Sequence, residues 1–257
     1  MPHFDIHSAI TSTCSAAYDQ ESFQLVRNLV IAALLECCSV DAFNKLKDTP
    51  LIESVSDQAH EDLLIFANKD PAAGSDPLFI AKTYTSYAAV MHYRLAHRVH
   101  LTTTKNCNSR EQSLAAIISR RGKFLSGAEI HFRSCIGARL IIDHGFGTVV
   151  GETSIIGDDC YILGGVTLGA RGIGSNFAVP RHPRIGNRVQ IGAFSSVLGP
   201  VSVGDDVFIG PCCIVTKDVP SGARVQVKTS LQVVLENEQY GYGLRRAAQY
   251  GKAVLQR

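Results

Sequence analysis

A six-residue repeat of aliphatic side chains runs through the second half of the chain and restricts its fold more than any other feature. The repeat occupies Ile130, Ile136, Ile142, Val150, Ile156, Ile162, Leu168, Ile185, Ile191, Val197, Val203, Ile209 and Val215. This period fits neither an α-helix nor the alternating face of a sheet. It is typical of a parallel β-helix, in which each hexad supplies a short strand and a corner. The aliphatic side chains are expected to point inward.

Two breaks interrupt the repeat, and we expect chemistry at both. The interval from position 142 to position 150 is eight residues, and the interval from 168 to 185 is seventeen. The extra residues must leave the coil as a loop and as an arm, and functional residues of repeat proteins gather in such excursions. The candidate functional side chains in them are Asp143, His144, Arg181 and His182.

A carboxylate precedes the first break by close to one coil. Glu129 lies fifteen residues before His144, so its side chain is expected beneath the loop that holds the histidine. Histidine can act as a base near neutral pH, and a carboxylate bonded to its far ring nitrogen fixes the tautomer. Arg181 offers a planar fork to a substrate carboxylate. This set can deprotonate a hydroxyl and hold an anionic substrate.

The first part of the chain lacks the hexad and instead shows apolar residues at helical spacing. Helices are expected over residues 18–47, 55–68, 78–100 and 110–121. Gly122 is expected to end the last of them. We therefore predict an α+β chain, with a helical N-terminal domain over 1–122, a β-helix domain over 123–227 and a C-terminal tail over 228–257.

Composition and charge exclude several classes of protein. The chain has 25 basic and 23 acidic residues and no basic run with interleaved aromatic residues, which argues against nucleic acid as a partner. It shows neither a signal-peptide pattern nor an apolar stretch of membrane-span length, so we expect a cytoplasmic protein with no membrane partner. The eight cysteines form no CxxC pair, which predicts reduced thiols rather than disulfides or a zinc site.

The segment AEIHFRSCIGARLIIDHGFGTVVGETSIIGDDCYILGGVTLGA, followed by RHPRIG, resembles the bacterial and plant serine O-acetyltransferases. The similarity covers roughly residues 65–218, and its specific motifs are IDHGFGTVVGET and RHP. It implies a left-handed β-helix enzyme of the hexapeptide-repeat family, with a helical N-terminal domain. The implied reaction is direct transfer of the acetyl group of acetyl-CoA to L-serine, without a metal, which feeds cysteine biosynthesis.

The resemblance also implies roles for the residues that hold and activate serine. His144 is expected to be the general base, and Glu129 falls where the family has an aspartate paired with that base. Asp143 falls where the family holds the substrate amino group, and Asp70 matches an aspartate of the helical domain that closes over the amino acid.

The second break carries the remaining implied contacts. Arg181 matches the arginine that binds the substrate carboxylate, and His182 matches the second active-site histidine. In this family acetyl-CoA lies along a groove between neighbouring coils, which suggests backbone contacts at Gly169, Ala170 and Ala193.

The resemblance further implies an oligomer, because family members form trimers with each site between neighbouring subunits, often doubled to hexamers. Members that dock into the cysteine-forming sulfhydrylase use a C-terminal isoleucine. This chain ends in Leu-Gln-Arg, so we do not expect that docking.

Three alternatives remain open at the level of sequence. The same base could act on another hydroxyl, such as homoserine, a modified amino acid or a sugar, although Arg181 and Asp143 favour an amino acid. The chain could also be a non-catalytic hexapeptide scaffold. A metal-dependent hydratase on the same repeat needs three histidines on adjacent coils, and His131, His144 and His182 lack the expected short paired spacing. We therefore expect no metal.

Overall fold

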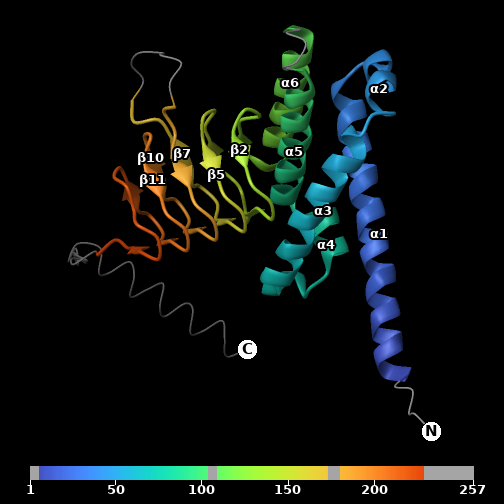
Figure 1. Cartoon of the computed structure of the whole chain (residues 1–257), viewed down its shortest axis with the longest axis horizontal. Coiled ribbons are helices and arrows are strands. Elements are labelled where there is room, and N and C mark those ends of the chain that lie inside the picture. The colour runs from blue at the N-terminus through green and yellow to red at the C-terminus, as the bar shows by residue number, and fades with distance from the viewer. Residues whose placement is uncertain (1–5, 104–108, 173–179, 229–257) are drawn as a thin grey trace, which may run out of the picture. The chain divides into compact units, whose positions relative to one another are not determined.

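The computed structural model describes residues 6–103, 109–172 and 180–228 (Figure 1). Within these ranges the helices are α1 (Ile6–Cys37), α2 (Val40–Leu46), α3 (Leu51–Lys69), the 3-10 helix η1 (Pro71–Ala73), α4 (Pro77–Thr83), α5 (Thr85–Thr103) and α6 (Ser109–Ser126). Part of the arm, residues 173–179, lies outside the described residues. So do residues 229–257, with the C-terminal segment on which the docking expectation rests.

Fourteen strands of two or three residues follow in the described part of the chain. They are β1 (Glu129–Ile130), β2 (Cys135–Ile136), β3 (Ile141–Ile142), β4 (Val149–Val150), β5 (Ile155–Ile156), β6 (Tyr161–Ile162), β7 (Thr167–Gly169), β8 (Arg184–Ile185), β9 (Gln190–Ile191), β10 (Ser196–Leu198), β11 (Ser202–Val203), β12 (Phe208–Ile209), β13 (Ile214–Val215) and β14 (Arg224–Val225). Parallel pairing gives three sheets, ordered β1-β4-β7-β10-β13, β11-β8-β5-β2 and β14-β12-β9-β6-β3. The predicted fold class, helices followed by a left-handed β-helix, is confirmed.

The hexad positions form the core of the β-helix, as predicted. All thirteen aliphatic side chains of the repeat are buried in one cluster, with exposed fractions of 8% or less. The strand register accounts for both breaks. Ile130 pairs with Val150 and Val150 with Leu168, whereas Leu168 pairs with Val197. The loop and the arm therefore leave the coil and return without shifting the strand ladder.

The helical region differs from the prediction at three points. The helix expected over 18–47 is divided near Ser39 into α1 and α2. The helix expected over 78–100 is divided at Tyr84 into α4 and α5, and the last helix continues through Gly122. A Cβ at Gly122 would lie 2.9 Å from His92 Cβ, so this glycine lets α6 pack closely on α5 instead of ending the helix. The helix ends before Gly127, whose φ is +74°. The domain boundary predicted after Gly122 stays a prediction.

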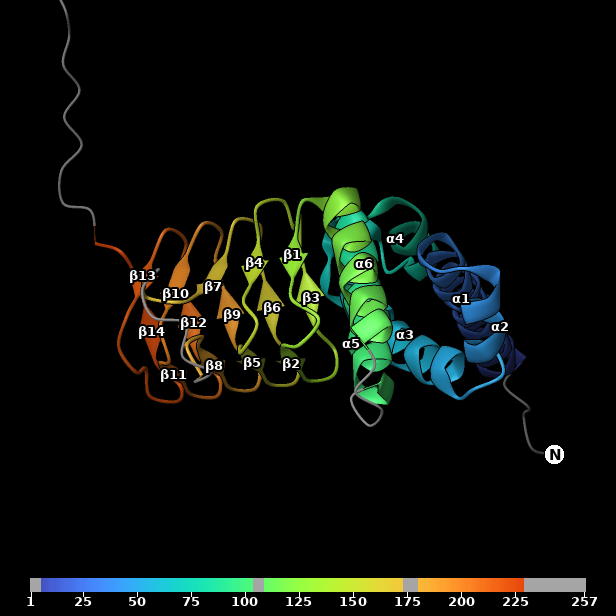
Figure 2. The same cartoon turned by 90° about the horizontal axis from the view of Figure 1, so that it is seen from above.

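A buried ion pair joins the helices to the first coil, against which α5 and α6 pack (Figure 2). Arg94 on α5 donates to both carboxylate oxygens of Asp62 on α3, at 2.8 and 2.9 Å. The same guanidinium donates to the carbonyl oxygens of Ile136 and Gly137, and Asp62 accepts from the N–H of Leu140. Both charged side chains are 1% exposed. These bonds fix the helices against the coil that leads into the first break.

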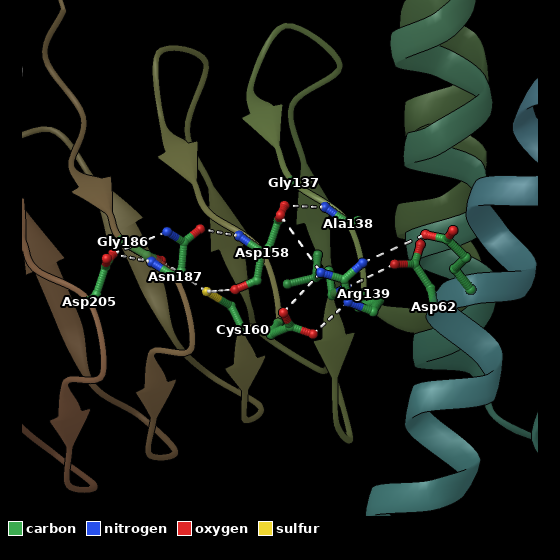
Figure 3. A network of polar contacts seen from close by, with 12 residues as sticks. Asp62, Gly137, Ala138, Arg139, Asp158, Cys160, Gly186, Asn187 and Asp205 are labelled. Atoms are coloured by element: carbon green, nitrogen blue, oxygen red, sulfur yellow. Dashed lines mark hydrogen bonds and ion pairs between the residues drawn. The ribbon is translucent and has the colours of Figure 1, made fainter.

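A ladder of side chains occupies the corner between the sheets of β2 and β3 (Figure 3). Asp158 Oδ1 accepts from the N–H of Ala138 at 2.8 Å, and Asn187 Oδ1 accepts from the N–H of Asp158 at 2.9 Å. Asp205 Oδ1 continues the ladder by accepting from the N–H of Asn187 at 2.7 Å. Each side chain thus satisfies a corner amide of the preceding coil. This corner has a structural role, and the two breaks lie on the other two corners.

Candidate functional site

A hollow of about 520 Å³ lies where the first break meets the helices. It is lined by Asp70, Ala72, Thr83, Tyr84, Thr85, Ser86, Asp143 and His144. Its walls therefore come from the region of η1, from the junction of α4 and α5, and from the loop between β3 and β4. The structure brings together three residues that the sequence placed in the site, namely Asp70, Asp143 and His144.

Two tyrosine hydroxyls orient the carboxylates of this hollow. Tyr84 Oη donates to Asp70 Oδ2 at 2.7 Å, and Tyr161 Oη donates to Asp143 Oδ2 at 2.9 Å. The hydrogen bond to Asp70 raises the pKa of Tyr84 to about 12. Burial and the hydrogen bond to Asp143 raise the pKa of Tyr161. Both hydroxyls are therefore protonated donors at neutral pH and hold the two carboxylates in place.

Sequence reasoning missed both tyrosines. Tyr161 precedes the inward hexad position Ile162, so the repeat could have shown that its side chain leaves the core. No comparable signal exists for Tyr84, because α4 separates it from Asp70 and only the folded chain brings the two together.

His144 stands at the rim of the hollow in a left-handed backbone conformation. Its φ is +61°, and its side chain is 82% exposed. A residue other than glycine in this conformation costs about 1–3 kcal/mol, so the surrounding structure must hold it there. Nδ1 of the ring lies 3.9 Å from Asp143 Oδ1. The residues that break the hexad thus place the imidazole outside the coil, at the edge of the hollow.

Glu129 does not reach this histidine. The register pairs Glu129 with Val149, because the loop adds two residues to the coil, and the carboxylate forms an ion pair with Lys123 near the end of α6. The expected position beneath His144 overlooked this lengthening. Within the described residues, the carboxylate found within ion-pair distance of the His144 ring is that of Asp143.

A second group of polar side chains lies at the other end of β4. Glu152 Oε2 accepts from Arg181 Nη2 at 2.7 Å, and its Oε1 accepts from Arg133 Nη1 at 2.7 Å. Thr153 Oγ1 accepts from the backbone N–H groups of Arg181 and His182, at 3.0 and 3.1 Å. The coil that follows the first break therefore holds the end of the arm in place.

The two groups lie at opposite edges of the sheet that contains β4. Asp143 and His144 precede this strand, whereas Arg181 and His182 bond to residues that follow it. One copy of the chain thus holds two separate groups of polar side chains. We call them the His144 corner, comprising Asp70, Asp143 and His144, and the Arg181 corner, comprising Glu152, Thr153, Arg181 and His182.

The residues expected to contact acetyl-CoA are divided between the same two edges. Gly169 ends β7 and Ala170 follows it, at the edge of the Arg181 corner, and Gly169 O accepts from the N–H of Gly199 at 2.9 Å. Ala193 precedes β10 at the edge of the His144 corner, and its carbonyl accepts from the N–H of Cys212 at 2.9 Å. The three residues therefore lie on two different corners of the coil.

Three further observations concern metals, membranes and thiols. Over residues 6–103, 109–172 and 180–228, no three His, Cys, Asp or Glu side chains gather as a metal-binding group. None of the described helices is long and apolar enough to cross a membrane. The cysteines that the structure describes are free thiols.

A β-helix of hexads with polar excursions at its corners defines a hexapeptide-repeat transferase. The family model described as bacterial transferase hexapeptide (six repeats) matches residues 182–217. A serine acetyltransferase of Helicobacter pylori is 43% identical over 155 residues, which are 60% of this chain and 84% of that relative. A serine acetyltransferase of Staphylococcus aureus is 39% identical over 165 residues, which are 64% of this chain and 72% of that relative. The chain belongs to the serine acetyltransferase family.

Solved structures of the family share this architecture. The serine acetyltransferase of Neisseria gonorrhoeae superposes with a TM-score of 0.66 at 29% identity, over 80% of this chain and 79% of that chain. The soybean serine acetyltransferase complexed with serine gives a TM-score of 0.65 at 29% identity, over 81% and 83% of the two chains. The family that the sequence motifs indicated is therefore confirmed.

Proposed function

We propose that this protein transfers the acetyl group of acetyl-CoA to the hydroxyl of L-serine, giving O-acetyl-L-serine and CoA. The observation that carries the proposal is the hollow that joins Asp70, Asp143 and His144. Two carboxylates suit the ammonium group of an amino acid, and the imidazole at their rim can take a proton from its hydroxyl. Membership of the family, and the soybean relative complexed with serine, support this acceptor.

In the proposed reaction, His144 removes the proton of the serine hydroxyl while the oxygen attacks the thioester carbon of acetyl-CoA. The C–S bond of the tetrahedral intermediate then breaks, and the CoA thiolate takes the proton from the imidazolium. Arg181 binds the substrate carboxylate through its planar fork. Asp143 is the carboxylate that this structure offers to steer His144, while the role expected for Glu129 stays a prediction. The proposal needs neither an acetylated residue nor a metal.

We also propose that the complete site forms between copies of the chain, in a homotrimer or in a hexamer built from two trimers. One copy keeps His144 and Arg181 at opposite edges of a sheet, so the His144 corner of one copy must face the Arg181 corner of the next. Phe146 and Phe194, which flank the His144 edge, are 78% and 71% exposed. Such exposed aromatic side chains suit a surface that a second copy covers.

Mixing two inactive variants tests the shared site. His144→Ala and Arg181→Ala, each inactive alone, should regain activity when they are coexpressed, because about a quarter of the sites in a randomly mixed trimer combine two intact corners. Mixed oligomers, verified by two affinity tags, that show no regained activity would refute the shared site.

An acceptor panel tests the reaction itself. Release of CoA from acetyl-CoA should be fastest with L-serine and slower with L-homoserine, and it should be absent with sugars. Turnover of a sugar but not of serine would overturn the proposal. We further propose that the product is consumed in cysteine biosynthesis in the cytoplasm. A strain that lacks its own serine acetyltransferase should then grow without cysteine when it carries this chain, but not when it carries the His144→Ala variant.

A further inference from the structure

The side chain of His182 is held by two polar groups of Thr153 and by one glycine. Thr153 donates its backbone N–H to His182 Nδ1 at 3.1 Å, and its Oγ1 lies 2.8 Å from the same nitrogen. A Cβ at Gly151 would collide with the far side of the ring, at Cδ2 and Nε2. The residue is 7% exposed. The ring therefore has a single orientation, in which Nδ1 faces Thr153 and Nε2 lies over Gly151.

This orientation determines which ring nitrogen of His182 carries the proton. A backbone N–H can only donate, so Nδ1 of His182 must accept and cannot itself carry hydrogen. Thr153 Oγ1 already accepts from two backbone N–H groups, which leaves its hydroxyl proton to donate to Nδ1 as well. The neutral ring must then carry its proton on Nε2. A second proton on Nδ1 would point at the N–H of Thr153.

The surroundings of His182 also favour the neutral ring, because their net effect is to lower its pKa. Burial is the main cause that lowers the pKa of His182, followed by the positive charge of Arg181 and, more weakly, by His131. Glu152 opposes them, but its carboxylate is bonded to Arg133 and Arg181. The imidazole is therefore neutral at neutral pH.

We infer that Thr153 is a positioning residue that keeps His182 as a neutral donor through Nε2–H, so that His182 binds an anionic oxygen in the site and does not transfer protons. This inference rests on the proposed function for the identity of that oxygen. It is either the carboxylate of the bound amino acid or the oxyanion of the tetrahedral intermediate. A carboxylate contact affects mainly the KM for serine, whereas an oxyanion contact affects mainly kcat.

Nitrogen NMR of the full-length protein tests the tautomer without any assay of activity. In protein labelled with ¹⁵N-histidine, the signals of His182 are those that disappear in His182→Gln. We expect a pyridine-like Nδ1 and a pyrrole-like Nε2 from pH 6 to pH 8, and the same pattern in Thr153→Ser. Thr153→Val keeps the backbone N–H but lacks the hydroxyl, so it should weaken the preference for the Nε2–H tautomer and shift both nitrogen signals part of the way toward those of a mixture. A protonated Nδ1 in the unaltered protein would overturn the inference, whether or not the protein acetylates serine.

Paired substitutions test the donor role in the reaction. Gln places an amide N–H near the position of Nε2, whereas Asn places its amide near Nδ1. His182→Gln should therefore keep kcat/KM within about tenfold of the original, and His182→Asn should lose about a hundredfold or more, the range for losing one oxyanion donor. Thr153→Ser should stay within about threefold, and Thr153→Val should lose about tenfold or more, because it removes all three hydrogen bonds that Oγ1 makes with Arg181 and His182.

Two outcomes of the kinetics would contradict the donor role. Equal losses in His182→Gln and His182→Asn would show that the ring works through proton transfer, because neither amide titrates. The same conclusion would follow if the pH profile of kcat/KM showed an ionisation near pH 6.5 in the original enzyme and lacked it in His182→Gln. If Thr153→Val fails to fold, the Ser variant and the Gln and Asn pair still decide the question.

Discussion

The His144 corner and the Arg181 corner each present one imidazole, and the two rings are held in opposite ways. The side chain of His144 is 82% exposed, and Nδ1 of its ring lies 3.9 Å from Asp143 Oδ1. His182 is 7% exposed as a residue, and its Nδ1 accepts from Thr153. The first ring is open to solvent and to a substrate, whereas the second is fixed in one orientation by its neighbours. One residue type thus suits two tasks because the backbone around it differs.

The two corners also differ in what builds them. The His144 corner needs the helices, because Asp70 and Tyr84 come from the helical region and complete the hollow. The residues of the Arg181 corner all belong to the coil and the arm, within residues 152–182. Disturbing the junction between helices and coil should therefore damage the first corner and spare the second.

Asp62→Asn should give the largest effect, because it leaves the buried guanidinium of Arg94 without its charged partner. Breaking one partner of a buried pair costs about 3–5 kcal/mol. The free energy of unfolding, measured with urea, should fall by that amount, and the KM for serine should rise. The ¹⁵N signals of His182 should not change. Asp206→Asn, at the exposed Arg188–Asp206 pair, is the matched control and should leave unfolding unaltered. Equal effects of the two substitutions would contradict the anchoring role.

His144→Ala should reduce kcat by about a hundredfold or more, the usual contribution of a general base. The side chain is exposed, so the midpoint of thermal unfolding should stay within about 2 °C of the original. Stopped assays of CoA release and a thermal melt check both statements. A variant that keeps more than a tenth of the activity would remove His144 from the role of base.

Asp70→Asn should act on serine binding more than on turnover. The hydrogen bond between an ammonium group and a carboxylate is worth about 1.5–3 kcal/mol, which corresponds to a rise of roughly tenfold to a hundredfold in the KM for serine. The KM for acetyl-CoA should not change. Tyr84→Phe is the milder matched variant, because it removes only the hydroxyl that orients Asp70. For this variant we expect the KM for serine to rise by about threefold to tenfold. If Asp70→Asn changed kcat alone, the carboxylate would not be binding the ammonium group.

The sequence was sufficient for the features that follow from periodicity. The thirteen side chains of the hexad, from Ile130 to Val215, are all buried in the β-helix as predicted, because the coil repeats the same local geometry. The breaks in the hexad indicated where the polar excursions lie for the same reason. Motif resemblance, rather than periodicity, linked Asp70 to the first break, and the structure places it beside Asp143 and His144.

The sequence was insufficient where the geometry depends on loops or on contacts between distant segments. Glu129 was expected beneath His144 because fifteen residues were taken as close to one coil, whereas the loop lengthens that coil and brings Val149 over Glu129. Gly122 resembled a helix stop, but its role is the close approach of α6 to α5. Thr153 and His182 bond to each other although strands β5, β6 and β7 lie between them in the sequence, so the hexad spacing could not indicate this contact.

Glu152→Gln should give the smallest effect, and its dependence on pH is the informative part. Hydrogen bonds from Arg133, and then from Arg181, lower the pKa of Glu152 below the usual value of 4.5. A carboxyl group whose pKa is depressed in the folded state stabilises the protein above its unfolded pKa, and this stabilisation disappears as the pH falls through the folded pKa. The partly exposed pair contributes about 0.5–1 kcal/mol.

The variant should therefore unfold at a lower urea concentration than the original protein at pH 7. When the urea midpoints of the two proteins are plotted against pH, the two curves should converge below about pH 4. Urea titrations at several pH values measure this directly. A difference that persists unchanged at low pH would mean that Glu152 supports the Arg181 corner through packing rather than charge. In that case Arg181 would keep its place without its partner, and the substitution should leave the KM for serine unaltered. Convergence of the curves together with an increased KM would instead show that the same ion pair stabilises the coil and orients the arginine.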